Sequence, residues 1–227
     1  MIAEEYLNTS PQRPQLTNQE GKSIFNIYNC LKSASAPFKK AKSQPNLHLP
    51  LNENKLTQIF VEQIEVFVKP FPNIAVKNQY SDTFFGTKGI PDFYFHKVEE
   101  GVHHLPIIVF EAKILASSFS GTKREKEYVI GEKNNGGIER FKSEKHGKGL
   151  SECGLLGFVE DKDFKHWRTT INGWIDDLSK LPKTTWKSDE MLSETDSNTD
   201  YCILTSIAHR ASNDININLT HLWVLVN

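Results

Sequence analysis

Cysteine is scarce in this sequence, and long apolar runs are missing. The three cysteines (Cys30, Cys153 and Cys202) are far apart and form no CxxC pair, which excludes a zinc knuckle and a disulfide framework. No segment approaches the roughly 20 apolar residues that span a bilayer, and the N-terminus lacks the basic and then apolar pattern of a signal peptide. We therefore predict a cytoplasmic protein with no membrane partner.

A strong net charge and a glycine-rich phosphate loop are also missing. With 27 Lys and Arg against 28 Asp and Glu, the formal charge is -1, so any affinity for nucleic acid must come from a local patch. Basic residues outnumber acidic ones in residues 121–150, although a solvated helix face would give the same composition. The stretch GTKREK lacks the glycine spacing of a nucleotide-binding loop, so ATP is not implied.

The 227 residues are enough for one domain of ordinary size with an extension. Residues 1–50, rich in Ser, Pro and Lys after one possible helix over about 19–31, are expected to be a loosely attached N-terminal arm. Residues 51–227 are expected to form a single domain. Within that domain, the polar and acidic stretch 182–200 is predicted to be a long loop.

The hydrophobic pattern of residues 51–227 indicates an α/β fold. Apolar residues recur at helical spacing from about Asn52 until Pro70 and Pro72 end the helix. Three strand-like runs follow, at 73–80, 90–97 and 105–115, and their turn-rich connections predict an antiparallel meander. A helix near Gly136, a strand at 153–160, a helix at 164–181 and a hairpin at 201–226 complete a central mixed sheet flanked by helices. In this interpretation Trp167, Trp174 and Trp223 are core residues rather than platforms for bases.

Charged residues interrupt the third run of the meander. Alternate strand residues share a face, so Glu111 and Lys113 are neighbours on one surface of the sheet. The meander should bring Asp92, at the start of the preceding run, beside Glu111. Two carboxylates and the main-chain carbonyl of Ala112 are hard oxygen ligands of the kind that Mg²⁺ prefers. With Lys113 next to such a metal, the group suits hydrolysis of a phosphodiester bond.

The pattern IPD, an intervening stretch and FEAK resembles the PD-(D/E)xK nuclease superfamily, which has the restriction-endonuclease-like fold. The resemblance covers about residues 52–160, and it implies a core of a helix, a three-strand meander, a helix and a further strand. It also implies Asp92 and Glu111 as ligands of Mg²⁺ or Mn²⁺, Lys113 as the catalytic lysine, and usually DNA as the substrate.

Many members of that superfamily carry another acidic residue in the helix before the meander. Among Glu53, Glu62 and Glu65, the turn of about 100° per residue places Glu53 on the sheet-facing side, in line with the apolar stripe. We therefore add Glu53 to the predicted catalytic and metal-binding residues. The alternative is an ordinary favourable carboxylate in the first turn of a helix.

The remaining candidates are basic residues and histidines. Arg140 and Lys142, in GGIERFKSEKHG, are predicted to contact phosphates, with a capped surface helix as the alternative. A phosphate-binding edge formed by His209, Arg210 and His221 is weighed against a structural role, and the pair at 103 and 104 has no ligand-spaced partner.

Together these features predict a metal-dependent DNA endonuclease of a prokaryotic defence or restriction system. It would act alone, as a homodimer or with a partner subunit that binds the N-terminal arm or the polar stretch. Two alternatives stay open: a catalytically inactive subunit that binds nucleic acid or protein, and a nuclease that acts on RNA.

Overall fold

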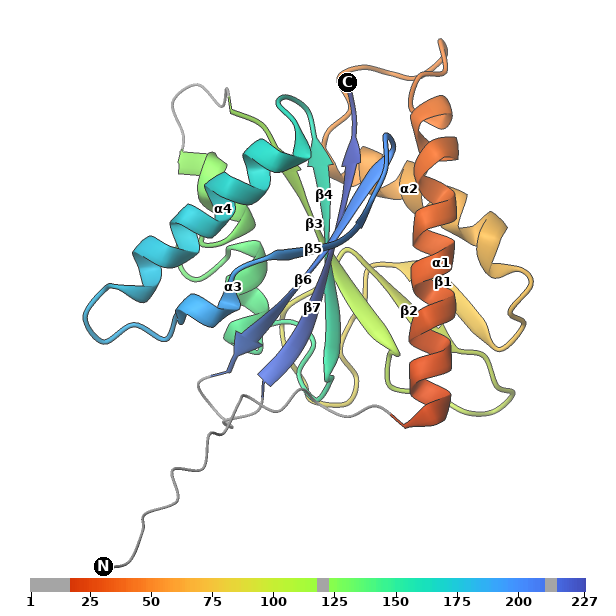
Figure 1. Cartoon of the computed structure of the whole chain (residues 1–227). Helices are drawn as coiled ribbons and strands as arrows, with labels where there is room; N and C mark the ends of the chain where they lie inside the picture. The colour runs from red at the N-terminus through yellow and green to blue at the C-terminus, as the bar shows by residue number, and fades with distance from the viewer. Residues whose placement is uncertain (1–16, 118–122, 211–215) are drawn as a thin grey trace, which may run out of the picture.

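A twisted β-sheet forms the centre of the molecule, and helices cover both of its faces (Figure 1). The computed structural model describes residues 17–117, 123–210 and 216–227. In these residues the sheet has seven strands in the order β1-β2-β3-β4-β7-β6-β5. They are β1 (Ile74–Asn78), β2 (Phe93–Lys97), β3 (Ile108–Leu115), β4 (Glu152–Val159), β5 (Ser193–Ser197), β6 (Tyr201–His209) and β7 (Asn216–Leu225).

The type of strand pairing changes twice across the sheet, from antiparallel to parallel and back. Strands β1, β2 and β3 form an antiparallel meander, β3, β4 and β7 are parallel neighbours, and β7, β6 and β5 are antiparallel again. Because β4 is parallel to β3, the chain must cross back between them, and α3 (Gly137–Lys142) lies on that crossover. The predicted α/β fold with a mixed sheet flanked by helices is confirmed.

Each face of the sheet has its own hydrophobic core. Helices α1 (Asn18–Ala41) and α2 (Glu53–Val68) cover one face, and α3 and α4 (Phe164–Ser179) cover the other. Along β3, Phe110 and Ala112 belong to the first core and Val109 and Leu115 to the second, as strand alternation requires. Trp167 and Trp223 are buried in the second core and Trp174 packs against it, as predicted.

The expectation of a loosely attached N-terminal arm was wrong for the residues from 18 onwards. Helix α1 is 24 residues long and continues through Pro37. Its fully buried Phe38 packs against Phe60 of α2 and Phe158 of β4, with ring centroids 5.3 and 5.6 Å apart. The serines favoured a loop in the prediction, but they are compatible with a helix interior. The Ser35 hydroxyl, for example, donates to the carbonyl of Leu31. Residues 1–16 lie outside the described residues.

The predicted loop at 182–200 was also partly wrong. It contains a 3-10 helix (Ser188–Glu190) and the edge strand β5. The residues of β5 are mostly exposed and polar, and they pair with β6 through main-chain hydrogen bonds. A hydrophobic pattern cannot reveal such a strand, because its side chains do not enter the core.

Candidate active site

The meander brings the predicted acidic residues together. In the β2–β3 ladder Phe93 pairs with Phe110, so the position before β2, Asp92, lies opposite Glu111. The main-chain N–H of Ala112 donates to Asp92 Oδ2 at 2.6 Å, and the N–H of Asp92 donates to the carbonyl of Phe110. Asp92 is therefore fixed to β3 by two hydrogen bonds, through both its side chain and its main chain.

Glu53 reaches the same place from α2. Asn52 caps this helix, accepting from the N–H of Lys55, so the Glu53 side chain is not needed to cap it. Instead Glu53 accepts from Lys113 Nζ and from the N–H of Ile114, both at 3.2 Å. The helix geometry predicted from the sequence therefore places the correct glutamate beside the sheet.

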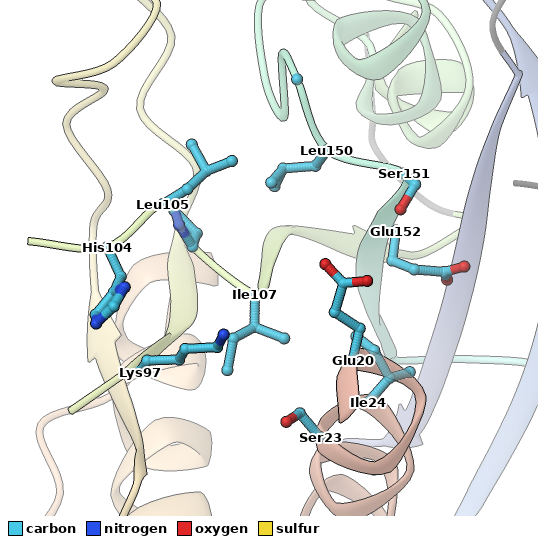
Figure 2. A pocket seen from close by; sticks show the side chains of 12 residues that line it. Glu20, Ser23, Ile24, Lys97, His104, Leu105, Ile107, Leu150, Ser151 and Glu152 are labelled. Carbon is cyan, nitrogen blue, oxygen red and sulfur yellow. The ribbon is translucent and has the colours of Figure 1, made fainter. Parts of the chain in front are cut away.

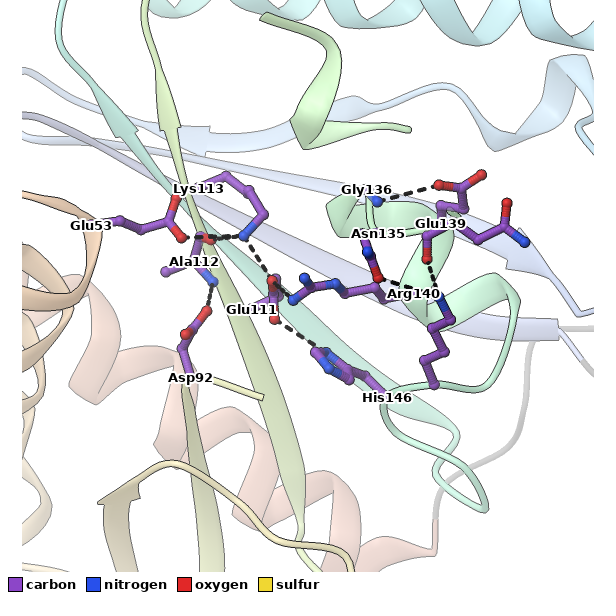
Figure 3. Close-up of polar contacts among 12 residues, drawn as sticks. Glu53, Asp92, Glu111, Ala112, Lys113, Asn135, Gly136, Glu139, Arg140 and His146 are labelled. Carbon is purple, nitrogen blue, oxygen red and sulfur yellow. Dashed lines mark hydrogen bonds and ion pairs between the residues drawn. The ribbon is translucent and has the colours of Figure 1, made fainter. Parts of the chain in front are cut away.

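The ammonium group of Lys113 lies among three oxygen atoms (Figure 3). It donates to Glu111 Oε1 and to the carbonyl of Ala112, both at 2.7 Å, and to Glu53 Oε1. Only 9% of the Lys113 side chain and 1% of the Glu111 side chain is exposed. Two charges so deeply buried need each other, because each would cost several kcal/mol if left alone.

Two further nitrogen-bearing side chains, Arg140 and His146, face Glu111 from the segment between β3 and β4 (Figure 3). Arg140 of α3 donates to Glu111 Oε1. Its guanidinium therefore adjoins the group of Glu53, Asp92, Glu111 and Lys113, which we call the acidic cluster. His146 Nδ1 lies 3.1 Å from Glu111 Oε2. The two atoms are not aligned for a hydrogen bond, however, and both are buried with no hydrogen-bond partner among the described residues.

Burial and mutual repulsion set the protonation of the carboxylates. Burial, followed by the negative charge of Glu111, raises the pKa of Asp92 to about 7, although the N–H of Ala112 opposes the shift. Burial also raises the pKa of Glu53, against the attraction of Lys113. Burial would raise the pKa of Glu111 too, but His146, Lys113 and Arg140 together lower it to about 2. Glu111 is thus ionised at neutral pH, while Asp92 is balanced between its two forms.

The donor set fits a hard divalent cation. Glu111 Oε2 has no hydrogen-bond partner among the described residues, and Asp92, whose pKa is raised by burial and then by the charge of Glu111, would gain from a cation beside it. The oxygens of Glu111, Glu53 and Ala112 already surround one cation, the Lys113 ammonium. In the described ranges no three His, Cys, Asp or Glu side chains form a ready-made cage. Mg²⁺ binds through one or two carboxylates and keeps several waters, so Asp92 and Glu111 are the residues that would hold it.

Gly137 allows α3 to approach the site. A Cβ at Gly137 would lie 2.8 Å from Leu155 Cδ2 and from the carbonyl of Tyr128, and 3.5 Å from Lys113 Cγ. Any other residue would push α3 away from β3 and β4. The glycine therefore sets the distance between Arg140 and the carboxylate that it contacts.

His146 is the site residue that the sequence analysis missed. It lies in the loop after α3, which Arg210 holds from the end of β6: the guanidinium donates to the carbonyls of Phe141, Gly147 and Leu150. Gly89 packs so closely that a Cβ there would lie 2.3 Å from the His146 ring. The signal in the sequence was the histidine beside glycine in KHGKG, but nothing local showed which way it would turn.

Several other candidates have structural roles. Lys142 was predicted to contact phosphates, but its ammonium is buried, with Glu190 and the carbonyls of Thr185 and His209 as partners. That prediction does not fit its position, because the lysine turns away from the acidic cluster into the second core. The imidazole of His209 faces Asp189, and Arg210 is buried among main-chain carbonyls.

His221 is held in a buried chain of hydrogen bonds. Trp223 Nε1, which can only donate, donates to the Tyr128 hydroxyl at 2.9 Å. That hydroxyl lies 2.8 Å from His221 Nδ1, and Ser206 Oγ lies 2.9 Å from Nε2. Burial lowers the pKa of His221 to about 3. A neutral imidazole at the centre of the core is not a phosphate-binding group.

The hollow beside the first turns of α1 is separate from the acidic cluster (Figure 2). It has a volume of about 220 Å³ and is lined by Glu20 of α1, Lys97 of β2 and Glu152 of β4, among others. Glu20 is occupied with capping α1 through Thr17. The hollow lies at the ends of β3 and β4 where these strands begin, whereas Glu111 and Lys113 lie in the middle of β3. It is therefore not part of the candidate active site.

Comparisons with protein-family models, curated proteins and solved structures found no match for this chain. The site is consequently interpreted from its own chemistry. Among the helices of the described segments, none combines the length and the apolar character needed to traverse a lipid bilayer.

Proposed function

We propose that this protein is a metal-dependent endonuclease that hydrolyses phosphodiester bonds of DNA. One observation carries the proposal: Glu53, Asp92, Glu111 and Lys113, from three separate elements, meet at one place on the sheet. The order of elements adds support. Helix α2, the β1–β3 meander, α3 and β4 follow one another as in the nuclease core that the sequence resembles, and β4 is parallel to β3.

In the proposed reaction Asp92, Glu111 and the carbonyl of Ala112 hold Mg²⁺ or Mn²⁺, assisted by Glu53. The bound metal supplies Lewis acidity toward the phosphate and the attacking water. Lys113 contributes a positive charge, because Glu111 and Glu53 raise the pKa of its ammonium against the effect of burial. From its position beside the carboxylates, this group donates hydrogen bonds to the phosphate oxygens as negative charge develops on them.

Arg140 and His146 act through Glu111. Arg140 contacts Oε1 and His146 faces Oε2, so each oxygen of this carboxylate has a nitrogen-bearing side chain beside it. Groups that hold a ligand residue in this way fix its orientation and its charge. About a quarter of the Arg140 side chain is exposed (26%), so the guanidinium can also reach toward an incoming phosphate.

The experiment is cleavage of supercoiled plasmid, linear duplex and single strands in Mg²⁺, Mn²⁺ or EDTA. Wild type is compared with Asp92→Asn and Lys113→Met, and with Lys142→Met as a matched buried lysine outside the site. We expect metal-dependent cleavage that the first two variants lose and the third retains. Cleavage that EDTA does not abolish, or that survives Asp92→Asn, would contradict the proposal. Matched RNA substrates in the same assay test the RNA-directed alternative.

One observation favours a second candidate, a nuclease-fold module that binds without cutting. Glu111 is already neutralised by Lys113 and Arg140, so the site satisfies its own charges. This candidate predicts nucleic-acid binding that is indifferent to Mg²⁺ and to Lys113→Met. The remaining biological proposals are a role in prokaryotic defence or restriction and action as a homodimer or with a partner subunit. Analytical ultracentrifugation with and without DNA tests the assembly.

A further inference from the structure

A row of aromatic rings leads away from the acidic cluster on the same face of the sheet. Asp92, directly before β2, and Tyr94 and His96 within it alternate along the chain, so their side chains share that face. The rings of Tyr80 and Tyr94 have centroids 5.0 Å apart, and those of Tyr94 and His96 are 5.4 Å apart. Tyr94 is two residues from Asp92, about 7 Å along the strand. The row therefore begins next to the proposed metal ligands.

These rings line a hollow of about 230 Å³ at the β1–β2 edge of the sheet. The loops before and after β2 complete it, and His103 contributes a further ring. That ring is stacked on exposed Phe84, with centroids 5.1 Å apart and planes 12° apart, and its Nε2 lies 2.6 Å from the hydroxyl of Thr83. The wall of the hollow thus contains several rings that neighbouring groups already hold in place, which lowers the entropy lost when a flat ligand stacks there.

The polar groups of the hollow suit a nucleotide. Lys77 pairs with Tyr94 across the β1–β2 ladder, so its exposed side chain lies on the same face as the rings. The carboxylate of Glu99 is paired with His104 at 2.8 Å, which reduces its repulsion of a phosphate. His96 Nδ1 lies 2.8 Å from the carbonyl of Lys97, so this nitrogen carries the proton. The other ring nitrogen, Nε2, is buried without a hydrogen-bond partner among the described residues.

We propose that this aromatic hollow (Tyr80, Tyr94, His96 and His103, with Lys77 at its rim) binds an unpaired base of a nucleic-acid strand whose backbone runs to Asp92 and Glu111. The inference rests on the proposed function and specifies its substrate as strands with unpaired nucleotides. In a duplex the faces of each base are covered by its neighbours, so a base can stack on Tyr94 only if it leaves the helix or belongs to a single strand. A hollow of this size also admits a base but not a double helix.

The test measures binding in EDTA, where cleavage cannot interfere. The probe is a single-stranded oligonucleotide carrying one 2-aminopurine, whose fluorescence falls when it stacks on an aromatic ring, and it is compared with the same sequence as a blunt duplex. We expect the single strand to bind about tenfold more tightly, which is the effect of one stacked base. Tyr94→Leu should lose that tenfold preference and the quenching, whereas Tyr94→Phe should keep both. Phe25→Leu, which removes an exposed ring from α1, should behave as wild type.

A second variant tests the proposal even if Tyr94→Leu lowers the stability of the fold too far for binding to be measured. Lys77 is exposed, so Lys77→Gln leaves the core intact. It should lower the slope of log affinity against log salt by about 0.7 for a single strand. Equal binding of duplex and single strand, or variants at both positions that bind as wild type does, would overturn the inference. In that case metal-dependent plasmid cleavage would still support the nuclease. Tyr94-dependent quenching without cleavage in any metal would instead leave the base-binding hollow and refute the nuclease.

Discussion

Replacing Lys113 with methionine separates the two effects of its ammonium group, on stability and on metal binding. The ammonium neutralises Glu111 and Glu53 at 2.7 and 3.2 Å. Removing one partner of a buried ion pair costs about 3–5 kcal/mol. Because Glu111 keeps Arg140 as a partner, we expect the lower end, about 3 kcal/mol. For a chain of this length such a loss lowers Tm by about 6–12 °C.

The same substitution should strengthen metal binding. Without the ammonium, the oxygens of Glu53, Glu111 and Ala112 lose the cation that they now surround. A divalent ion can then neutralise their negative charge. A tenfold gain in affinity adds about 1.4 kcal/mol of metal-dependent stability, or roughly 3–6 °C in Tm. The variant should therefore be less stable than wild type in EDTA, more responsive to Mg²⁺ or Mn²⁺, and inactive in cleavage.

Thermal unfolding at pH 8 across a series of metal concentrations measures both effects. Lys142→Met is the matched control, because Lys142 is also a buried lysine paired with a buried glutamate, Glu190, but lies outside the acidic cluster. It should destabilise the protein without changing its response to metal. If Lys113→Met melts with wild type in EDTA, or responds to metal no more than Lys142→Met does, the assignment of Lys113 and the oxygens around it to a cation site is wrong.

Three further predictions follow from the charges of the site and the core. The raised pKa of Asp92 favours its protonated form in the folded protein up to about pH 7, so metal affinity and the rate of cleavage should increase as pH rises through about 7. Metal titrations of the wild type that give the same affinity well below and well above pH 7 would refute this. Arg140→Gln should lower activity about 10- to 100-fold, with less loss in Arg140→Lys, as measured by kcat/KM for plasmid nicking. Burial lowers the pKa of His221 to about 3. Below about pH 6.5 this histidine therefore binds a proton in the unfolded chain but not in the folded protein. Stability should therefore fall by up to about 1.4 kcal/mol per pH unit between about 6.5 and 3, and urea unfolding of His221→Gln should lack this component.

The acidic cluster could be predicted because it depends on local geometry. Strand alternation alone puts Glu111 and Lys113 on one face, and helix periodicity alone selects Glu53 as the glutamate that faces the sheet. Asp92 required one more step, the antiparallel pairing of two neighbouring strands, and short turn-rich connections favour that pairing. Each of these predictions needs only the periodicity of one element or the connection between two neighbouring strands.

The partners of Glu111 needed the tertiary structure. His146 faces the carboxylate because Arg210, 64 positions later, holds the intervening loop by its carbonyls, and no periodicity within the loop encodes that contact. Arg140 and Lys142 are two residues apart on one short helix, yet Lys142 enters the core and Arg140 reaches the site. Which side of that helix meets the sheet depends on how α3 docks against β3, β4 and β6. Strand and helix periodicity therefore predict the carboxylates and the lysine from the sequence alone, whereas long-range packing places Arg140, His146 and the aromatic rings beside them.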